Sequence, residues 1–498
     1  MTASPHSDHP TADRPSGARP LRSAVVLGGS LAGLLAARAL VEFADVVTVV
    51  ERDVLPDGPE RRKNLPQAQH VHTLWSGGAK AMEELVPGVT GLLAEAGAHR
   101  VPLTKDMVAL SSQGWFRRWD ESHHMILCSR DLLDATVRAQ ILGDDRIKLV
   151  ERAEALGLEG TAGSVTGVRV RGHADADTDA DADTGRDTDT DTEYTLPADL
   201  VVDATGRASR APEWLTALGV PEPEVRHVNS GLAYASRVFR APENARHGFP
   251  ILNVQAAPRD GRPGRSGVMV PIEDGRWMVT LSGTRGGEPT SDEDDFERFA
   301  TEGLRHPVIG EFIAGAEPLT GVAFTRTTAN RRYYYERSRQ WPDGFLVIGD
   351  ALAAYNPIYG HGMSVAAQSA VALRNVIRRQ GWGTPRLARA LQKAVARPVN
   401  AAWDLATGQD VFFPGATETG PTLRDRILAA YVDRLLYTAT GNGRIARRFT
   451  DVSSLERGAH VLLAPSVLLA AVIGPLKPQL TGPPLTDDEW KAAGDRSS

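Results

Sequence analysis

The chain has 498 residues, of which 42% are hydrophobic and 24% are charged, and its formal net charge is −6. This composition is typical of a soluble globular protein, and the length allows two or three domains. The one cysteine, Cys128, excludes a disulfide framework, a thiolate metal cluster and a redox-active cysteine pair, and it fits a reducing cytoplasm. Residues 174–194 carry −8, so the rest of the chain is near neutral and has no patch typical of nucleic-acid binding.

Two segments are expected to lie outside the folded core. Residues 1–22 are rich in Pro, Ser, Asp, His and Arg and lack an apolar run, which predicts a disordered tail and not a signal peptide. Residues 174–194 form an Asp/Thr/Ala insert with too few apolar side chains to offset the entropy cost of ordering. Its acidic spacing also lacks the register of an EF-hand calcium loop, so we predict a mobile loop.

Residues 24–53 predict the first βαβ unit of a dinucleotide-binding domain. The apolar run 24–27 predicts a buried strand, residues 34–40 a helix and residues 46–50 a second strand. The turn between the first strand and the helix reads GGSLAG. A helix that begins after such a turn presents free N–H groups and a positive dipole end to a pyrophosphate.

Individual residues of this unit have expected roles. Gly28 permits the tight turn, and Gly33 lets the helix pack closely on the strand. Ser30 stands where the usual G-x-G-x-x-G fingerprint has its middle glycine, which makes this match an incomplete one. Glu51 follows the second strand, where a carboxylate can accept hydrogen bonds from a ribose.

The remaining chain predicts an α/β protein with a second sheet. We expect helices at 79–93, broken at 87–88, and at 129–141, a strand pair within 108–119, and strands at 147–150, 165–170, 200–206, 231–240, 267–271, 276–283 and 345–348. A helix is expected to begin near Gly362, and the chain reads as helical from about residue 385.

Two further stretches place polar residues at the ends of buried strands. Residues 349–364, GDALAAYNPIYGHGMS, deliver Asp350 to the carboxyl end of a strand, where open α/β sheets bind their ligands. Asp350 can accept from a ribityl or ribose hydroxyl, and the following turn leads into a helix N-terminus that can stabilise negative charge on the N1–C2=O edge of a reduced flavin. Residues 201–210, VVDATGRASR, place Asp203 at the end of another strand.

In this order, the three stretches resemble the nucleotide, DATGR and GD motifs of flavoprotein monooxygenases with the para-hydroxybenzoate hydroxylase fold. The resemblance extends over nearly the whole chain. The segments PQAQHVHTLWSGGAKAMEELVPG, CSRDLLDATVR, PIEDGRWMVTLSGTRGGEP and YNPIYGHGMS are similar to the epoxidases of polyether ionophore biosynthesis, of the monensin and lasalocid type. The insert at 174–194 has no expected counterpart in that family.

The resemblance implies a Rossmann-like FAD-binding domain, a mostly antiparallel β-sheet substrate domain and a C-terminal helical region. The implied FAD-binding parts are 23–107, 125–214 and 326–384. Residues 108–124 and 215–325 belong to the substrate domain, and 385–498 are helical. The predicted cofactor-binding residues are Gly28, Ser30, Leu31, Ala32, Gly33, Glu51, Arg52, Arg62, Arg130, Asp203, Gly349, Asp350, Pro357, Gly360, Gly362 and Met363.

The resemblance also implies the reaction. Reduced FAD and O₂ give a flavin C4a-hydroperoxide, which passes one oxygen atom to an alkene of a linear polyene polyketide, either free or bound to a carrier protein. NADPH or NADH supplies the electrons, directly or through a separate flavin reductase. The flavin performs this chemistry, so we predict no catalytic side chain and no metal. The predicted substrate-binding residues are His72, Trp75, Met269, Thr284, Tyr355 and Tyr359.

Other functions stay open at this point. An aromatic hydroxylase would need a base to deprotonate a phenol, and a flavin-dependent reductase of isoprenoid double bonds shares the DATGR form. A flavin halogenase shares motifs too, but the W-x-W-x-I-P signature is absent from the sequence. The pair His70 and His72 has no visible carboxylate partner for a metal. Residues 460–474 are apolar and could lie on a membrane, but they are too short to span one. We expect instead a core helix or one that closes a substrate tunnel, and no membrane partner.

Overall fold

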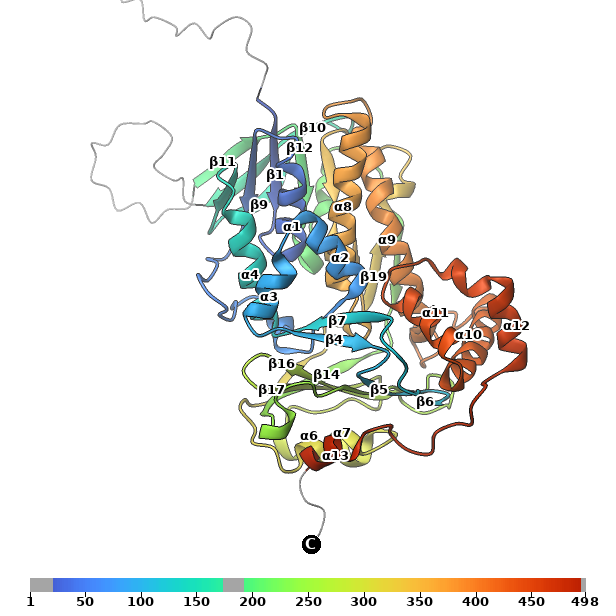
Figure 1. Ribbon diagram of the computed structural model, residues 1–498. Helices are drawn as coiled ribbons and strands as arrows, with labels where there is room; N and C mark the ends of the chain where they lie inside the picture. Colours follow the sequence, from blue (N-terminus) through green and yellow to red (C-terminus); the bar gives the residue numbers. More distant parts are fainter. Residues whose placement is uncertain (1–20, 173–191, 494–498) are drawn as a thin grey trace, which may run out of the picture.

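The computed structural model describes residues 21–172 and 192–493 (Figure 1). The predicted tail at 1–22 lies outside these residues except for its last two. The predicted acidic loop at 174–194 lies outside them except for residues 192–194. Those three residues begin strand β11 (Thr192–Pro197), which pairs with β10 (Val165–Gly172), so the insert joins two neighbouring antiparallel strands.

A parallel five-stranded sheet contains the N-terminal strand, and its five strands confirm the predicted ones. Its order is β20-β12-β1-β2-β8, with β1 at Ser23–Leu27, β2 at Val46–Val50, β8 at Ile147–Val150, β12 at Leu200–Asp203 and β20 at Phe345–Val347. These strands are short apolar runs, as strands buried on both faces should be. Helices that pack with this sheet in one hydrophobic core include α1 (Leu31–Leu40), α4 (Arg130–Leu142), α8 (Gly362–Gln380) and α9 (Leu387–Asp410).

The helix predicted at 79–93 is confirmed together with its break. It forms α2 (Ser76–Leu85) and α3 (Val89–Glu95), and Gly88 between them has φ +86°, a left-handed conformation that glycine adopts without strain. The predicted helix at 34–40 begins three residues earlier than expected, at Leu31. A short helix, α5 (Ala211–Ala217), follows the DATGR stretch.

The second large sheet is mostly antiparallel, as predicted. Its seven strands lie in the order β18-β14-β17-β16-β15-β5-β6, with β5 at Met107–Ser111, β6 at Gly114–Trp115, β14 at Ala233–Arg240, β15 at Ile251–Val254, β16 at Arg265–Ile272, β17 at Arg276–Gly283 and β18 at Ala323–Thr325. Only β15 and β5 run parallel to each other. Helices α6 (Glu293–Arg298) and α7 (Val308–Ile313) cover its outer face, at the bottom of Figure 1.

Three small sheets were largely missed by sequence reasoning. The sheet β3-β7-β4 (Thr73–Trp75, His123–Leu127 and His99–Leu103) lies between the two large sheets in Figure 1, and its apolar side chains pack on the inner face of the antiparallel sheet. The second small sheet has the order β11-β10-β9, with β9 at Glu154–Gly160. The third small sheet consists of β13 (Val225–Val228), β19 (Asn330–Tyr333) and β21 (Ala353–Ala354).

The C-terminal region is helical, as predicted, and its last segment packs on the antiparallel sheet. After α10 (Leu423–Gly441), α11 (Gly443–Ser453) and α12 (Pro465–Ile473), the chain returns to the antiparallel sheet and forms α13 (Asp487–Trp490). The Trp490 ring stacks on Phe312 with centroids 5.6 Å apart. The expectation of a core helix in 460–474 is wrong, since α12 buries only Val467 and Ala471. Among the described residues, no helix is long and apolar enough to cross a membrane.

Candidate functional site

The turn between β1 and α1 requires glycine at two positions. Gly28 has φ +101°, and a Cβ there would lie 2.7 Å from the carbonyl oxygen of Ala204. A Cβ on Gly33 would lie 1.9 Å from the carbonyl oxygen of Gly28. These close approaches bring the first turn of α1 against the end of β12. The first-turn N–H groups of α1 have no carbonyl of their own helix to bond, so they are available to an anion.

Glu51 and Arg62 meet beside this turn, both buried. Oε2 of Glu51 accepts a hydrogen bond from the Gly29 N–H at 2.7 Å and lies 3.0 Å from Nη2 of Arg62. Nη1 of Arg62 donates to the Ser30 hydroxyl at 3.0 Å, and Oε1 of Glu51 accepts from the Asp53 N–H. Because a carboxylate offers about four acceptor positions, three protein donors leave Glu51 one position for a ribose hydroxyl.

Asp350 stands at the carboxyl end of β20, as predicted, in a short turn against α1. A Cβ on the preceding Gly349 would lie 2.9 Å from the Cβ of Ala32, so this turn touches the start of α1. The carboxylate is set deep in the fold yet open on one side. Surrounding protein raises the pKa of Asp350, the charges of Arg207 and Arg130 oppose that rise, and 43% of the side chain stays accessible. An accessible acceptor in this position suits a ligand hydroxyl.

Arg130 lies near both Asp350 and His72, since its charge acts to lower the pKa of each of them. Arg130 is the first residue of α4, whose N-cap Ser129 accepts from the Leu132 N–H at 3.1 Å. Its Nε donates to Asp134 at 2.7 Å. Burial, together with the charge of Arg130, lowers the pKa of His72 to about 3, so His72 is neutral at pH 7.

The loop before α8 is held from two directions. The Trp75 indole N–H donates to the carbonyl of Tyr359 at 3.2 Å, and a Cβ on Gly360 would lie 2.1 Å from the Thr73 hydroxyl. Gly362 begins α8 and is exposed, and a Cβ there would have no neighbouring protein atom within 4 Å. The first-turn N–H groups of α8, from Gly362 and Met363 on, have no carbonyl of their own helix to bond.

A buried polar network on the other side of this loop was not predicted. Asp410, the last residue of α9, accepts hydrogen bonds from the side-chain amides of Asn330 and Asn356 at 2.7 and 2.8 Å. It also accepts from the Tyr359 hydroxyl at 3.0 Å, and the Tyr234 hydroxyl donates to Asn356 at 2.9 Å. The network ties α9, β19 and β14 to the loop. Asn356 stands inside the YNPIYG stretch, but Asp410 follows it 54 residues later with no local signal.

The DATGR turn is held by hydrogen bonds of its own and is bonded to the loop that follows the GD turn. The Asp203 carboxylate is fully buried and accepts from the N–H and hydroxyl of Thr205 and from the Ser209 hydroxyl. The carboxylate oxygens of Asp203 are therefore used to hold the turn, which lends no support to its predicted contact with the cofactor. Arg207 from the same turn donates to the Tyr355 carbonyl at 2.6 Å and to the Ala329 carbonyl at 2.9 Å. Arg207 thus links the DATGR turn to the loop that follows the GD turn, a contact that was not predicted.

Several predicted residues lie apart from this space. Met269 was predicted to bind the substrate, and this is wrong, because it is buried with Trp277 on the outer face of the antiparallel sheet against α7. The Thr284 hydroxyl accepts from the Gly264 N–H at 2.8 Å, at the end of β17. Tyr355 is buried with its hydroxyl 3.5 Å from the Val399 carbonyl of α9, and the Arg52 side chain is 59% exposed. These placements lend no support to ligand contact by the four residues.

The other predicted residues surround the site. Leu31 is buried in α1, Ala32 touches the GD turn, and Pro357 is exposed at the loop beside Tyr359. His70, beside His72, has its Nδ1 2.8 Å from the Ser236 hydroxyl, and burial lowers its pKa to about 4. Among the described residues, no group of three or more His, Cys, Asp or Glu side chains could hold a metal ion.

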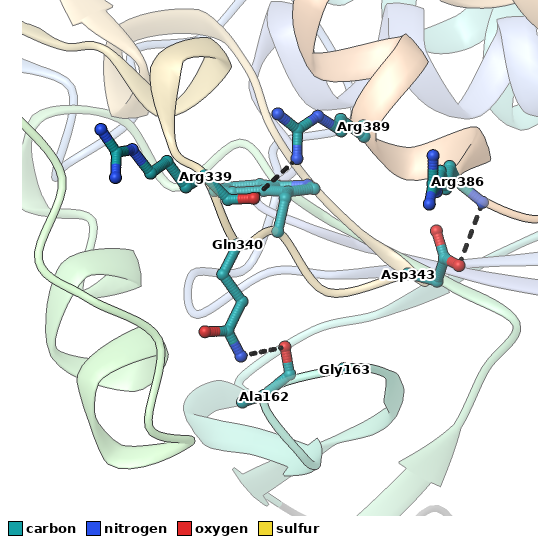
Figure 2. Close-up of a pocket in the computed structure, with 8 residues that line it drawn as sticks. Ala162, Gly163, Arg339, Gln340, Asp343, Arg386 and Arg389 are labelled. Carbon is teal, nitrogen blue, oxygen red and sulfur yellow. Dashed lines mark hydrogen bonds between the residues drawn. The ribbon is translucent and has the colours of Figure 1, made fainter.

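A separate hollow of about 510 Å³ lies at the opposite end of the parallel strands. Figure 2 shows Arg339, Arg386 and Arg389 around it, with the Arg386 N–H on Asp343 at 3.1 Å and Arg389 on the Arg339 carbonyl at 2.8 Å. Asp343 precedes β20, so this hollow is at the amino ends of the strands. Ligands of open α/β sheets bind at the carboxyl ends, so this hollow is not the cofactor site.

Comparison with known proteins places the chain in a family. It is 30% identical over 446 residues to protein Rv3254 of Mycobacterium tuberculosis, an alignment that covers 88% of this chain and 91% of that protein. The chain belongs to the family of Rv3254. No protein-family model matches the sequence.

Similar solved structures are flavoproteins at low identity. A flavoprotein/dehydrogenase from Cytophaga hutchinsonii has a TM-score of 0.61 at 14% identity, covering 90% of this chain and 96% of that one. The flavin-dependent halogenase CmlS has a TM-score of 0.59 at 17% identity, covering 84% and 73%. The p-nitrophenol 4-monooxygenase PnpA of Pseudomonas putida has 0.56 at 18% identity, covering 88% and 99%. The chain therefore has the fold of FAD-binding monooxygenases and halogenases, which confirms the predicted fold class.

Proposed function

We propose that the chain is a cytoplasmic FAD-dependent monooxygenase that epoxidises alkenes of a linear polyene polyketide in polyether antibiotic biosynthesis. The observation that carries the flavin assignment is the position of Asp350 at the carboxyl end of β20, in a turn that contacts the start of α1 and close enough to Arg130 for its charge to act on the Asp350 pKa. The epoxidase assignment is supported by the resemblance of four long segments, and it is the finer part of the proposal.

The residues present fit FAD. The first-turn N–H groups of α1 would meet the pyrophosphate, and Asp350 would accept from a ribityl or ribose hydroxyl. Gly362 leaves room for a ring beside the N-terminus of α8, where N–H groups and the helix dipole would stabilise negative charge on the reduced flavin. Bound FAD would supply the oxygen-transfer chemistry of the site.

The chain's own residues then orient and shield the reaction. His72, neutral at pH 7, adds no charge next to an apolar substrate, and Trp75 fixes the loop 355–361 by its bond to the Tyr359 carbonyl. The proposed reaction consumes an alkene, O₂, two electrons and two protons, and yields an epoxide and water. NADPH or NADH supplies the electrons, directly or through a separate reductase.

The deciding experiment is stopped-flow absorbance on the holoprotein, reduced without air and then mixed with O₂, with and without a linear polyene ester. We expect a transient band before reoxidation and a product heavier by one oxygen atom, with ¹⁸O incorporated from ¹⁸O₂. A phenol is tested in parallel. Turnover of the phenol alone would favour an aromatic hydroxylase, turnover that requires halide would favour a halogenase, and loss of a double bond without O₂ would favour a reductase.

A further inference from the structure

Helix α12 and the segments on either side of it expose a large apolar surface. Six apolar side chains of α12 and its flanking segments are between 44% and 78% exposed: Leu463, Leu468, Leu469, Val472, Ile473 and Leu476. Val467 and Ala471, one turn apart, face inward and are buried. The helix thus packs by one narrow stripe and leaves most of its apolar side chains in water.

The start of α10 continues this surface. Leu423 and Ile427 are 74% and 64% exposed, and they share a helical stripe with Tyr431, since the three stand four residues apart. The Tyr431 hydroxyl donates to the Leu462 carbonyl, just before α12. Leu428, 52% exposed, lies beside this stripe. We call the six exposed side chains around α12, together with Leu423, Ile427 and Leu428, the α12 surface. Such a gathering marks an interaction site because monomers rarely expose large contiguous apolar patches.

The charges around the α12 surface are predominantly positive. Residues 422–477 contain seven Arg and one Lys but only four acidic residues, a net charge of +4 in a chain of net charge −6. All four acidic side chains have protein partners: Asp425 caps α10 through Thr422, Asp433 pairs with Arg259, Asp451 with Arg448 and Glu456 with Lys80. Arg424, Arg426 and Arg434 are exposed on α10 itself.

We propose that the α12 surface docks on an anionic lipid bilayer, with α12 lying in the plane of the interface. Helices of this kind bury their apolar face at the boundary between headgroups and acyl chains, and nearby basic side chains bind anionic headgroups. With nine residues, α12 is far too short to span. A second copy of the chain is a poorer occupant, since a two-fold interface would bring the arginines of both copies together. This inference does not depend on the proposed function.

The test is flotation of the full chain with vesicles made of equal parts phosphatidylglycerol and phosphatidylcholine, and with pure phosphatidylcholine vesicles. We expect the protein to float with the anionic vesicles at low salt and to bind less at high salt and on neutral vesicles. The variant Leu469→Glu/Val472→Glu should reduce the floating fraction by at least about fivefold, because two charges would enter the apolar layer.

A matched control changes two apolar side chains exposed elsewhere, Leu21→Glu/Val225→Glu, and should float like the wild type. Circular dichroism checks that both variants are folded. Absence of flotation with anionic vesicles, or equal flotation of the α12 variant, would overturn the proposal. Light scattering on the free protein would also overturn it if it found a dimer that the α12 variant dissociates, since the second copy would then be the occupant.

Discussion

The Tyr359 hydroxyl donates a 3.0 Å hydrogen bond to Asp410, a buried carboxylate that lies at the end of a helix and 51 residues further along the chain. Tyr359 belongs to the loop that leads into α8, so this bond couples the position of the loop to the packing of α9. Two side-chain amides, from Asn330 and Asn356, complete the set of donors around Asp410. The carboxylate is thus the acceptor through which α9 is bonded both to β19 and to the loop before α8.

We predict that Asp410→Asn destabilises the protein by about 2–4 kcal/mol, because an amide group would face donors that need an acceptor. Tyr359→Phe removes one donor and should cost about 1 kcal/mol. Urea denaturation of both single variants and the double variant measures the coupling. We expect the double variant to lose less than the sum of the two, and strictly additive losses would contradict the shared network.

Asp350→Ala should yield largely flavin-free protein, because it removes an accessible acceptor at the carboxyl end of β20. The absorbance ratio of bound flavin to protein after gel filtration measures the loss. The control is Asp120→Ala, a change at an exposed aspartate before β7, which should keep its flavin. Full flavin content in the Asp350 variant would show that the cofactor lies elsewhere.

Gly362→Ala separates ligand binding from folding. No protein atom lies within 4 Å of the new methyl group, so stability should change by less than about 1 kcal/mol, and a gain is expected in a helix. The space is kept for the flavin in our proposal, so flavin binding should weaken by at least about tenfold.

The control for this change is Gly91→Ala in α3, where an added methyl group also meets nothing within 4 Å. It should change stability in the same way and leave flavin binding unaltered. Fluorescence titration of the apoprotein with FAD measures both variants. If Gly362→Ala bound FAD as tightly as the wild type, the ring would not approach the start of α8.

Much of the fold was predictable because its signals are local. The strands 24–27, 46–50 and 345–348 are apolar runs followed by turns, and the close approach that requires Gly33 is to the carbonyl of Gly28, five residues away. Asp350 follows directly from the strand before it. Such residues are determined by their neighbours in sequence, so the βαβ unit and the GD turn could be found without coordinates.

The unpredicted parts depend on distant contacts. Asp410 is recognisable only once α9 is placed beside Asn330 and Asn356. Met269 was assigned to the wrong face because a strand buried on both faces has no polar alternation to orient it. Strands such as β4, with the sequence HRVPL, carry polar residues and a proline that masked them.

Buried neutral histidines should make stability depend on pH. Burial lowers the pKa of His361 to about 4, and its Nε2 lies 2.8 Å from the Ser453 carbonyl, where it must donate. The unfolded chain takes up a proton near pH 6.5 while the folded chain does not. The free energy of unfolding should therefore fall as the pH drops from about 6.5 to about 4, by up to about 1.4 kcal/mol per pH unit from this residue.

His361→Gln keeps a side-chain N–H donor and removes the titration. Urea denaturation at several pH values between about 7.5 and about 4.5 covers the range in which the unfolded histidine takes up its proton. In this range, the free energy of unfolding should depend less steeply on pH in the variant than in the wild type. The exposed His460→Gln serves as the control and should reproduce the wild-type slope. An unchanged slope in the His361 variant would mean that the ring becomes protonated within the folded protein, which requires the α8 N-terminal loop to open.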